Sequence, residues 1–587
     1  MFGDPIENRH AVVAVTSGMV LFGFVPIYMI GLSPGDYAFI DIGKIFALTL
    51  PLTLLYSLLL IALNYLGKRR LGERNPLPMI GIFVLCWICC SGFLLPSSVS
   101  MEMAEAQGIP LNFKNMATVA IVAAGMTLAA RTSAFRYINI FLIVLVTTAC
   151  VPLLPNIFKQ SMRADGSARI GIVTLSPAEN IIVLSLDGLP GTAMRKALNG
   201  DSEYADYFKD FLSYENVVAT SPATVVSLAA EVHGNRDFKT VATTETSLLK
   251  KLDHRDLLIN SPDHDVYTYG EYNSFNLNPD RIVRMGELRE GQSLGRKWGD
   301  VFDFYDIVFA RVGSRYLVKL FAPFRQRFLG IIISNINEDV ESPDIRLLLN
   351  HRGPNWDKKL VGTIDDYRGF IENLRVGSNL KPAIRYLHFP FTHFPIDFDE
   401  KCNYRGDDLD WITSNQNEGG IGGEIACSLE LVAEFLQKLE SLDVYDKSLI
   451  VIKSDHGKPG NYYSSSPANL CLNDQCTMGL DRYRPMLKIK PRGRRAGEET
   501  LIDKMVLLDD LAKTLCFEAK GNGGCDRYAG LNLLDPLSEA PQGFFINVAA
   551  NGRSSHMFDT LISVKLERSR SIIESMKANS KIKMSSP

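Results

Sequence analysis

Three separate stretches of the 587-residue chain carry side chains that can bind a divalent metal ion. Asp187 ends the apolar run NIIVLSLDG, and Asp455 and His456 end the run SLIVIKSDHG. His388 and His393 lie together in HFPFTHFP, although the chain has only nine histidines. Zinc accepts both carboxylate and imidazole ligands. These residues predict a metal site, whereas a single aspartate after a strand is often only a cap or turn residue.

A candidate nucleophile lies in the segment NVVATSPATVVSLAAEVHGN, residues 216–235. It places Thr220, Ser221, Thr224 and Ser227 just before an apolar helical run. Hydroxyls at the start of a helix usually act as caps. A hydroxyl near the positive end of a helix dipole and beside a metal ion can instead lose its proton and attack an anionic phosphoryl centre.

Strands that alternate with helices would bring these residues together. The runs 180–186, 383–389 and 448–455 are apolar and end in polar or glycine-rich residues, which is typical of buried parallel strands. Residues 428–442 show apolar side chains at helical spacing. This alternation predicts a doubly wound sheet, whose ligands bind outside the carboxyl ends of the strands. The candidate metal ligands are therefore expected to converge.

The first part of the chain, to about Asn156, is dominated by long apolar runs. Five segments approach the roughly 20 apolar residues that cross a bilayer. These predicted transmembrane segments are Val12–Leu32, Ile45–Leu66, Leu77–Leu95, Met116–Ala130 and Ile138–Leu154. A cleaved secretory signal is the alternative for the first segment, but Pro26 interrupts it and no small-residue cleavage site follows.

Basic residues predict the orientation of these segments, because cytoplasmic loops are enriched in Lys and Arg. Two loops are basic: Lys68, Arg69, Arg70 and Arg74 follow the second segment, and Arg131 and Arg136 follow the fourth. With five spans, the residues after Asn156 are then outside. We expect a multi-pass protein of the plasma (inner) membrane with an extracytoplasmic, periplasmic soluble domain.

The cysteines agree with that compartment. Cys86, Cys89, Cys90 and Cys150 lie in predicted spans, and the soluble part contains an even number. Their spacing suggests local disulfides, which need an oxidising compartment. The expected pairs are Cys471–Cys476, Cys516–Cys525 and Cys402–Cys427. A zinc cluster is the alternative, but no pair has CxxC spacing with a nearby histidine.

Length and charge limit the remaining possibilities. A chain of 587 residues needs more than one core. We expect a transmembrane helical domain at 1–156, a linker at 157–178, a soluble catalytic domain at 179–550 and a C-terminal tail at 551–587. The net charge of −3, with acidic and basic residues interspersed, gives no electrostatic reason for a nucleic-acid partner.

The ordered motifs resemble the alkaline phosphatase superfamily, in particular its sulfatase-like branch of membrane phosphoethanolamine and phosphoglycerol transferases. The resemblance covers about residues 180–535. It includes LSLDG, TSPATVVSLAAEVHG, HFPFTHFP, SDHG, DLAKTL and YAGLNLL in that order. It implies an α/β alkaline-phosphatase-like (sulfatase-like) domain with a mainly parallel central sheet, after an N-terminal bundle of about five transmembrane helices.

The resemblance also implies roles for the candidate residues. Asp187, Thr224, Asp455 and His456 would hold a primary zinc ion, Zn²⁺, with Mn²⁺ as an alternative, and Thr224 would be the nucleophile. The residues that would bind substrate phosphate or a second metal ion are His388 and His393, with His393 the closer match.

Spacing within the motif favours Thr224 over Ser221 as the nucleophile. The family has a Ser three residues after the nucleophile and often a Gly ten residues after it, as Ser227 and Gly234 are here. A sulfatase is disfavoured, because its formylglycine forms in a C/S-x-P-x-R motif, and the residues after Thr224 include neither that Pro nor that Arg.

One departure from the family lies after SDHG. A further His often follows there, whereas this chain has DRYRPM. Arg482 or Arg484 is therefore expected to contact phosphate through its bidentate fork.

The activity implied is transfer of a phosphoethanolamine or phosphoglycerol type group from a membrane phospholipid donor to an envelope glycan or lipid acceptor, through a phosphothreonine. One alternative is a membrane-anchored phosphodiesterase that uses water in the second step. The other is a catalytically degenerate domain that binds a phosphorylated glycan.

Overall fold

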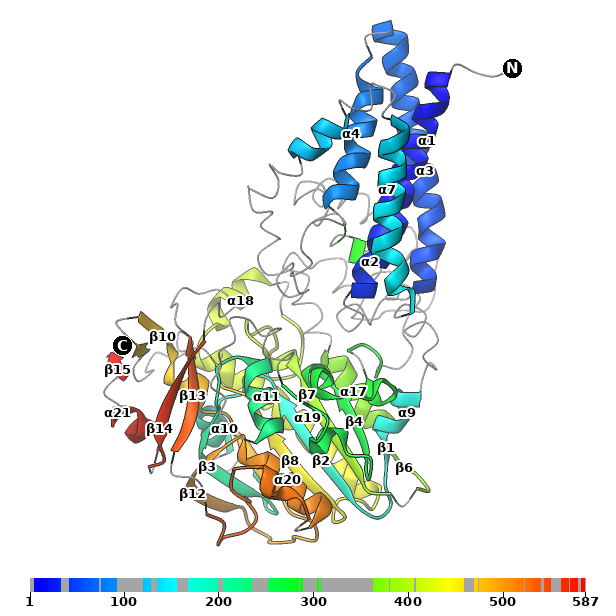
Figure 1. Cartoon of the computed structure of the whole chain (residues 1–587). Coiled ribbons are helices and arrows are strands. Elements are labelled where there is room, and N and C mark those ends of the chain that lie inside the picture. Colours follow the sequence, from blue (N-terminus) through cyan, green and yellow to red (C-terminus); the bar gives the residue numbers. More distant parts are fainter. Residues whose placement is uncertain are drawn as a thin grey trace. The chain divides into compact units, whose positions relative to one another are not determined.

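The chain divides into two compact units, each built from two separate stretches (Figure 1). The first unit is Met1–Ala164 with Gly291–Trp356, and the second is Asp165–Glu290 with Asp357–Pro587. The computed structural model describes residues 5–32, 42–72, 75–91, 120–127, 135–155, 167–198, 204–234, 252–283, 285–288, 304–305, 308, 363–379, 381–405, 408–458, 469–472, 475–521, 523–539, 543–549, 561–569, 571–578 and 582–585.

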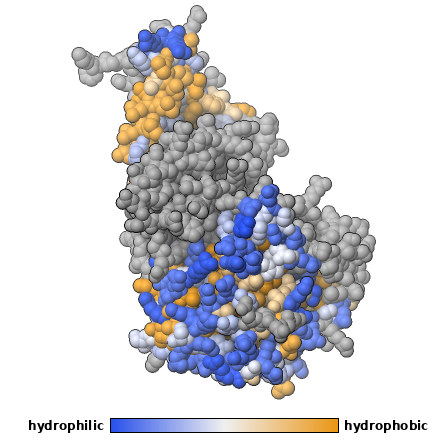
Figure 2. Space-filling model, turned by 180° about the vertical axis from the view of Figure 1, so that it is seen from behind, coloured by the Kyte–Doolittle hydropathy of each residue, from blue (hydrophilic) through white to orange (hydrophobic). Residues whose placement is uncertain are grey.

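The first unit is a bundle of apolar helices. One helical stretch runs through α1 (Pro5–Met19), a π-helical turn (Val20–Phe24) and α2 (Val25–Leu32). It contacts the helices α3 (Ile42–Leu71), α4 (Leu77–Cys89) and α7 (Phe135–Cys150), the last followed by a 3₁₀ turn at Val151–Leu153. Figure 2 shows hydrophobic residues over much of the described helical surface, and mostly hydrophilic residues over the second unit.

Two helices, rather than the predicted five, are long and apolar enough to cross a membrane within the described residues. They are Val12–Gly31, with 20 residues, and Ile42–Leu71, with 30. The third and fifth predicted segments contain the shorter apolar helices Met79–Cys89 and Val144–Leu153. The fourth is described only at 120–127, which is helical.

A distant part of the chain enters the core of the helical unit. Phe304, Tyr305 and Val308 are buried among its apolar side chains. The Tyr305 hydroxyl donates to the carbonyl of Phe22 (2.8 Å), within the π-helical turn, and Thr49 Oγ1 donates to the same carbonyl (2.9 Å). No local pattern in the sequence predicts this packing.

The second unit is an α/β domain around an eight-stranded sheet, in the order β12-β3-β11-β8-β2-β7-β4-β5. Strand β11 is antiparallel to β3 and β8, and the other pairs are parallel, so the mainly parallel sheet predicted from the sequence is confirmed. The strands are β2 (Asn180–Leu186), β3 (Leu212–Val218), β4 (Asp265–Tyr269), β5 (Ile282–Val283), β7 (Ala383–Phe389), β8 (Ser448–Lys453), β11 (Leu487–Lys490) and β12 (Thr500–Leu507).

The three strands predicted from apolar runs are adjacent in the middle of this sheet. β2 pairs with β7 on one side and with β8 on the other, and every residue of the three strands is buried. Continuous apolar runs of this kind suit strands that are covered on both faces. The register places Ser185 beside both His388 and Lys453, so the polar residues that follow these strands emerge at one edge.

Helices cover both faces of the sheet. On one face, α11 (Thr224–His233) and α20 (Asp510–Lys520) pack together and share a core with alternate residues of β2 and β8. Elsewhere, α19 contacts three other helices and covers the helix predicted at 428–442 except for its last residue, Leu442, which is the C-cap. These four helices are α10 (Gly191–Leu198), α17 (Thr363–Asn373), α18 (Leu409–Asn415) and α19 (Glu418–Ser441).

Smaller elements surround the sheet. The helix α9 (Ser167–Val173) precedes the two-stranded pair β1 (Thr174–Leu175) and β6 (Arg375–Val376). Residues after 550, expected as a tail, contribute to the second unit: β14 and α21 share a core with β3, and Arg568 pairs with buried Asp510 (3.0 Å). The remaining elements are β9 (Asn469–Leu472), β10 (Gln475–Gly479), β13 (Gly543–Ala549), β14 (Leu561–Glu567), α21 (Ile572–Lys577) and β15 (Ile582–Ser585).

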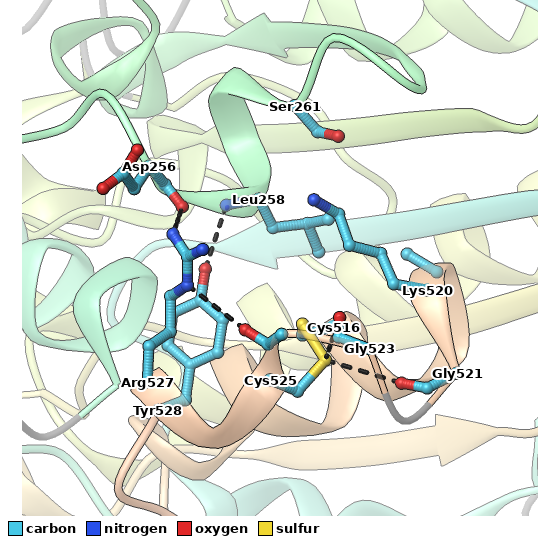
Figure 3. Close-up of a disulfide and its surroundings, with 12 residues drawn as sticks. Asp256, Leu258, Ser261, Cys516, Lys520, Gly521, Gly523, Cys525, Arg527 and Tyr528 are labelled. Carbon is cyan, nitrogen blue, oxygen red and sulfur yellow. Dashed lines mark hydrogen bonds between the residues drawn. A yellow bond between two sulfur atoms is a disulfide. The ribbon is translucent and has the colours of Figure 1, made fainter.

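Two of the three predicted disulfides are present: Cys402–Cys427 and Cys516–Cys525. Figure 3 shows the second, which joins α20 to the turn before Tyr528. The Tyr528 hydroxyl accepts from the N–H of Leu258 (2.9 Å), so this turn is tied to a third segment. Cys471 and Cys476 are register partners in the antiparallel β9–β10 pair, but their side chains lie outside the described part, so their disulfide stays a prediction.

Candidate active site

The turn after β2 positions Asp187. Its N–H donates to Phe389 O (3.2 Å) at the end of β7, and Thr392 Oγ1 donates to the carbonyl of Asp187 (2.6 Å). Gly188 has a φ of 66°, which favours glycine, and its N–H donates to Asp455 Oδ1 (3.0 Å). The turn after β2, which carries Asp187, is thus hydrogen-bonded to Asp455 at the end of β8.

The turn after β8 positions Asp455 and His456. The His456 N–H donates to Asp455 Oδ1 (2.9 Å), and His456 Nδ1 lies 3.1 Å from the carbonyl of Gly457. A carbonyl only accepts, so this contact requires the hydrogen on Nδ1 and leaves Nε2 of the neutral ring with a free lone pair. The ring therefore presents a ligand nitrogen to the site.

The three candidate ligands fit a metal ion. One ligand atom each from Asp187, Asp455 and His456 lie within 4.8 Å of one another, and all three residues are buried. His456 Nε2 is 3.2 Å from Asp455 Oδ2 and 3.9 Å from Asp187 Oδ1. Neither of those oxygens has a hydrogen-bond partner among the described residues. These buried oxygens have lone pairs and no hydrogen-bond donor, and a bound cation would neutralise their charge.

Electrostatics at the site keep the ligands in their metal-binding forms. Burial, followed by the charge of Arg482, lowers the pKa of His456 to about 3, so its ring is neutral at neutral pH. Burial acts to raise the pKa of Asp187, but the nearby imidazoles of His393, His388 and His456 hold it below its usual value. Asp187 is therefore ionised.

Thr224 is brought to these ligands. It is the first residue of α11, and the cap residue before it is Ala223, which makes no side-chain cap hydrogen bond. Thr224 Oγ1 lies 3.1 Å from His456 Nε2. Because Nε2 carries the lone pair, the Thr224 hydroxyl is the donor, and it points to the candidate metal site instead of capping its own helix.

The neighbouring hydroxyls make structural contacts. Ser227 Oγ donates to the carbonyl of Asp455 (2.7 Å), Ser221 Oγ accepts from the N–H of Ala223 (3.2 Å), and Thr220 Oγ1 donates to the carboxylate of Asp509 (2.7 Å). Ten residues after Thr224, Gly234 ends α11 with a φ of 64°, and a Cβ there would lie 2.7 Å from the Tyr528 ring. The spacing that favoured Thr224 thus has a structural basis.

His388 lies beside Asp187 between two carboxylates. Its Nε2 is 3.5 Å from Asp187 Oδ2 and 3.3 Å from Glu271 Oε2, and its Nδ1 is 3.0 Å from Ser185 Oγ. Burial acts to lower its pKa, but Glu271, Asp187 and Asp455 raise the pKa to about 9. His388 is therefore a buried cation at neutral pH.

His393 differs from His388 in both exposure and charge. It is partly exposed, its ring stacks on Phe394 with 4.2 Å between centroids, and its Nδ1 lies 2.6 Å from the Phe394 carbonyl. Burial, Arg482 and Lys458 lower its pKa to about 4, although Asp187 opposes them. A neutral, accessible imidazole near the ligands can contact a substrate.

The two candidate arginines have different surroundings. Arg482 is buried, and its guanidinium donates to the carbonyls of Pro222 and Gly457. Arg484 is partly exposed and pairs with Asp481 at 3.5 Å. The structure therefore places Arg482 within the loops of the site and turns Arg484 toward Asp481.

Sequence reasoning missed two charged groups near the site. Glu271 follows β4, whose five residues are a weak strand signal, and β4 pairs directly with β7. Lys458 pairs with Glu424 of α19 at 2.7 Å and donates to the carbonyl of Thr392. Burial raises the pKa of Glu424 to about 7, although Lys458 opposes the shift. Glu271 lies two residues after β4, so its sequence signal was weaker than that of Asp187, which directly follows β2.

Comparison with solved structures finds similarity to members of the alkaline phosphatase superfamily. A phosphonate monoester hydrolase of Agrobacterium radiobacter is 14% identical, with a TM-score of 0.39 over 67% of this chain and 86% of that one. The lipoteichoic acid synthase LtaP from Listeria monocytogenes is 14% identical, with a TM-score of 0.31 over 70% and 88%. An alkaline phosphatase superfamily protein from Vibrio parahaemolyticus is 11% identical, with a TM-score of 0.34 over 70% and 83%.

No family model and no curated protein matches this chain.

Proposed function

We propose that this protein is a metal-dependent transferase that moves a phosphoryl-linked group through a covalent intermediate on Thr224. The observation that carries this proposal is the position of Thr224 Oγ1, 3.1 Å from His456 Nε2 at the start of α11. An aliphatic hydroxyl placed beside three buried ligand atoms, at the positive end of a helix, suits attack on an anionic centre.

Asp187, Asp455 and His456 would hold the metal ion, with Thr224 as a fourth ligand. We propose Zn²⁺, because these residues combine carboxylates with an imidazole, and Mn²⁺ is the alternative. When bound, the ion would lower the pKa of the Thr224 hydroxyl and neutralise charge on the phosphoryl oxygens. Two oxygens that otherwise have no hydrogen-bond partner among the described residues support such a site.

The reaction proposed is a double displacement. Thr224 Oγ1 forms a bond to phosphorus, the bond from phosphorus to the diacylglycerol oxygen breaks, and the proton lost by the threonine is balanced by protonation of that oxygen. An acceptor hydroxyl then bonds to phosphorus, the bond to Thr224 Oγ1 breaks, and the acceptor's proton balances the one regained by the threonine. His388 provides positive charge near the transferred phosphate, and the accessible ring of His393 lies where it can contact the substrate.

A membrane phospholipid is the proposed donor, because the helical unit has the character of a membrane anchor. Helix α3 has 30 residues, about 45 Å at 1.5 Å per residue, which is more than the hydrocarbon core of a bilayer needs. Its exposed large apolar side chains include Phe46, Leu50, Leu54, Leu55, Leu58, Leu59, Leu63 and Leu66. Lipid would cover such a surface, whereas water would not.

A membrane anchor also bears on the topology, the transferred group and the acceptor. We propose five spans, a periplasmic catalytic domain, a phosphoethanolamine or phosphoglycerol type group, and an envelope glycan or lipid as acceptor. The disulfides of the second unit support an oxidising compartment.

The test uses a phospholipid donor labelled in its head group and the full-length protein in lipid bilayers. We expect the label on a peptide that contains Thr224, followed by its appearance on a glycan or lipid acceptor. Label released only to water would favour the hydrolase alternative. A protein that binds neither metal nor label would be the degenerate binding domain.

A further inference from the structure

The side chain of Arg482 joins two turns of the candidate site. Its Nε–H donates to the carbonyl of Pro222 (2.8 Å), and its Nη1–H donates to the carbonyl of Gly457 (3.0 Å). Pro222 lies two residues before Thr224, and Gly457 directly follows His456. One guanidinium therefore connects the nucleophile's turn to the ligand's turn.

The Gly457 carbonyl also sets the orientation of His456. It accepts from His456 Nδ1 (3.1 Å) as well as from Arg482 Nη1 (3.0 Å). The first contact fixes which ring nitrogen carries the hydrogen, and so directs the Nε2 lone pair toward Thr224 Oγ1. Any rotation of that carbonyl would alter both the ring and the arginine contact.

The backbone of Arg482 strengthens this connection. The Gly457 N–H donates to the carbonyl of Arg482 (3.0 Å), so the two residues are bonded in both directions. A Cβ on Gly457 would lie 2.0 Å from the carbonyl oxygen of Asp481, so the turn packs directly against the segment that carries Arg482. Arg482 itself is only 3% exposed.

A third loop of the site meets the same side chain. The Arg482 guanidinium lies over the Phe394 ring, 5.0 Å from its centroid, and that ring stacks on His393. Arginine forms such contacts with aromatic rings while its planar N–H groups donate to other partners. The three loops that carry Thr224, His456 and His393 thus share one contact residue.

We propose that Arg482 is a positioning residue that holds Thr224 and His456 in register for metal binding and transfer, instead of the phosphate contact expected from the sequence. This inference rests on the proposed function only where it concerns turnover. Its consequence for metal affinity follows from the contacts to Pro222 and Gly457 alone.

Arginine suits this task and lysine does not. A lysine ammonium is a flexible point charge, so it cannot reproduce two donors at fixed separation, although it keeps the positive charge. We call the two hydrogen bonds from Arg482 to the carbonyls of Pro222 and Gly457 the clamp. Arg482→Lys therefore separates the geometry of the clamp from its charge. Changes to groups that orient metal ligands typically cost about 10- to 100-fold in metal affinity or activity.

The experiment compares Arg482→Lys and Arg482→Gln with wild type, all as the full-length protein. A control, Arg492→Lys, changes another arginine that donates to a backbone carbonyl, that of Glu518 (3.1 Å). Arg492 follows Lys490, which pairs with Ile450 near the start of β8. Arg492 is therefore at the opposite end of β8 from the site. The measurements are Zn²⁺ affinity of the metal-free protein, inhibition by inorganic phosphate, kcat, KM and melting temperature.

We expect Arg482→Lys to bind Zn²⁺ about 10- to 100-fold more weakly and to lose kcat by a similar factor. KM and the inhibition constant of phosphate should change by less than about threefold, since no substrate contact is removed. Phosphate inhibition weakened in proportion to kcat would overturn the proposal, because it would make Arg482 a phosphate contact. Unchanged Zn²⁺ affinity, or unfolding of both Arg482 variants, would overturn it too. If wild type shows no transfer, the proposed function fails, and the Zn²⁺ measurement still judges the clamp.

Discussion

Thr224 Oγ1 lies 3.1 Å from His456 Nε2, although 232 residues separate the two in the chain. Two features of the fold produce this contact. His456 follows a central strand of the sheet, and Thr224 begins the helix that packs against one face of it. The Ser227 hydroxyl, one turn further along the helix, donates to the carbonyl of Asp455, which fixes the helix start against the turn.

Thr224→Ala should abolish transfer while leaving the fold intact. The threonine makes no cap hydrogen bond and alanine has a better helix propensity, so the melting temperature should stay the same or rise slightly. Loss of the nucleophile should reduce kcat by at least about 1000-fold. The measurement is turnover of a labelled lipid donor together with a thermal melt.

Thr224→Ser and Ser221→Ala are the matched controls. The serine variant keeps a hydroxyl at the site and should retain turnover. Ser221→Ala removes only a contact to the Ala223 N–H and should cost about 0.5–1.5 kcal/mol of folding free energy. Full activity in Thr224→Ala, or a covalent label on Ser221, would show that we have chosen the wrong residue.

Asp455→Asn should remove the metal ion without unfolding the domain. Asp455 Oδ1 accepts from the N–H groups of Gly188 and His456, and the amide oxygen of asparagine can accept both. Its amide nitrogen would replace the ligand oxygen Oδ2, so Zn²⁺ should bind at least about 100-fold more weakly. Elemental analysis and a Zn²⁺ titration would measure this, with exposed Asp253→Asn as control. Equal zinc content in both variants would reject the site.

The sequence predicted the parts of the site that depend on strand ends. Asp187 and Asp455 follow uninterrupted apolar runs, and such runs are buried in the middle of a parallel sheet, so their carboxyl ends meet. Thr224 was chosen among four hydroxyls because Ser227 and Gly234 match the spacing of the family that the sequence resembles. In the structure, Ser227 donates to the carbonyl of Asp455 and Gly234 ends the helix that Thr224 begins.

The rest of the site depends on contacts that no local pattern encodes. Glu271 reaches His388 only because β4 lies next to β7 in the sheet order, although β7 comes much later in the chain. The charge of Arg482 is visible in the sequence, but its direction toward two carbonyls depends on how three loops fold. In the helical unit, the burial of Tyr305 among apolar side chains and its hydrogen bond to the π-helical turn are likewise long-range contacts.

The two disulfides should stabilise the second unit to different extents. Cys516–Cys525 closes a separation of 9 residues and Cys402–Cys427 one of 25. In the chain-entropy model, the double Cys→Ser variants should lose about 2.6 and about 3.5 kcal/mol of unfolding free energy respectively. Denaturant unfolding would measure both values, and a larger loss at Cys516–Cys525 would contradict this order. Peptide mapping without reduction should also find Cys471 linked to Cys476.

A reporter fused after Asn156 should be active only on the outer side of the membrane. The basic residues after α3 predict that this loop is cytoplasmic, and the three further predicted spans would then lead outside. If the two long helices are the only spans, the chain returns to the cytoplasm and the reporter should be active there instead. A cytoplasmic reporter would contradict both a lipid donor in the outer leaflet of the membrane and disulfides formed in an oxidising compartment.

Ionisation of Asp509 should reduce stability as the pH rises. Asp509 is buried before α20, and burial raises its pKa from 3.8 to about 7, although the hydrogen bond from Thr220 opposes the shift. Between these two pH values, the unfolded carboxyl is ionised while the folded one keeps its proton. The folded state then binds more protons, so the free energy of unfolding falls as the pH rises from about 4 to about 7.

Asp509→Asn should remove this part of the pH dependence, because the amide does not titrate while its oxygen can still accept from Thr220 Oγ1. Melting temperatures at several pH values between 4 and 8 would give the difference between variant and wild type. The pKa of Glu424 is also raised to about 7, but Glu424 is present in both proteins. Its contribution therefore cancels in the difference, which reports on Asp509 alone. The advantage of Asp509→Asn should grow with pH and level off above about 7, whereas exposed Asp280→Asn should show no such trend. A constant difference across this range would mean that Asp509 titrates equally in the folded and unfolded chain, and that its burial beside Thr220 does not affect its charge.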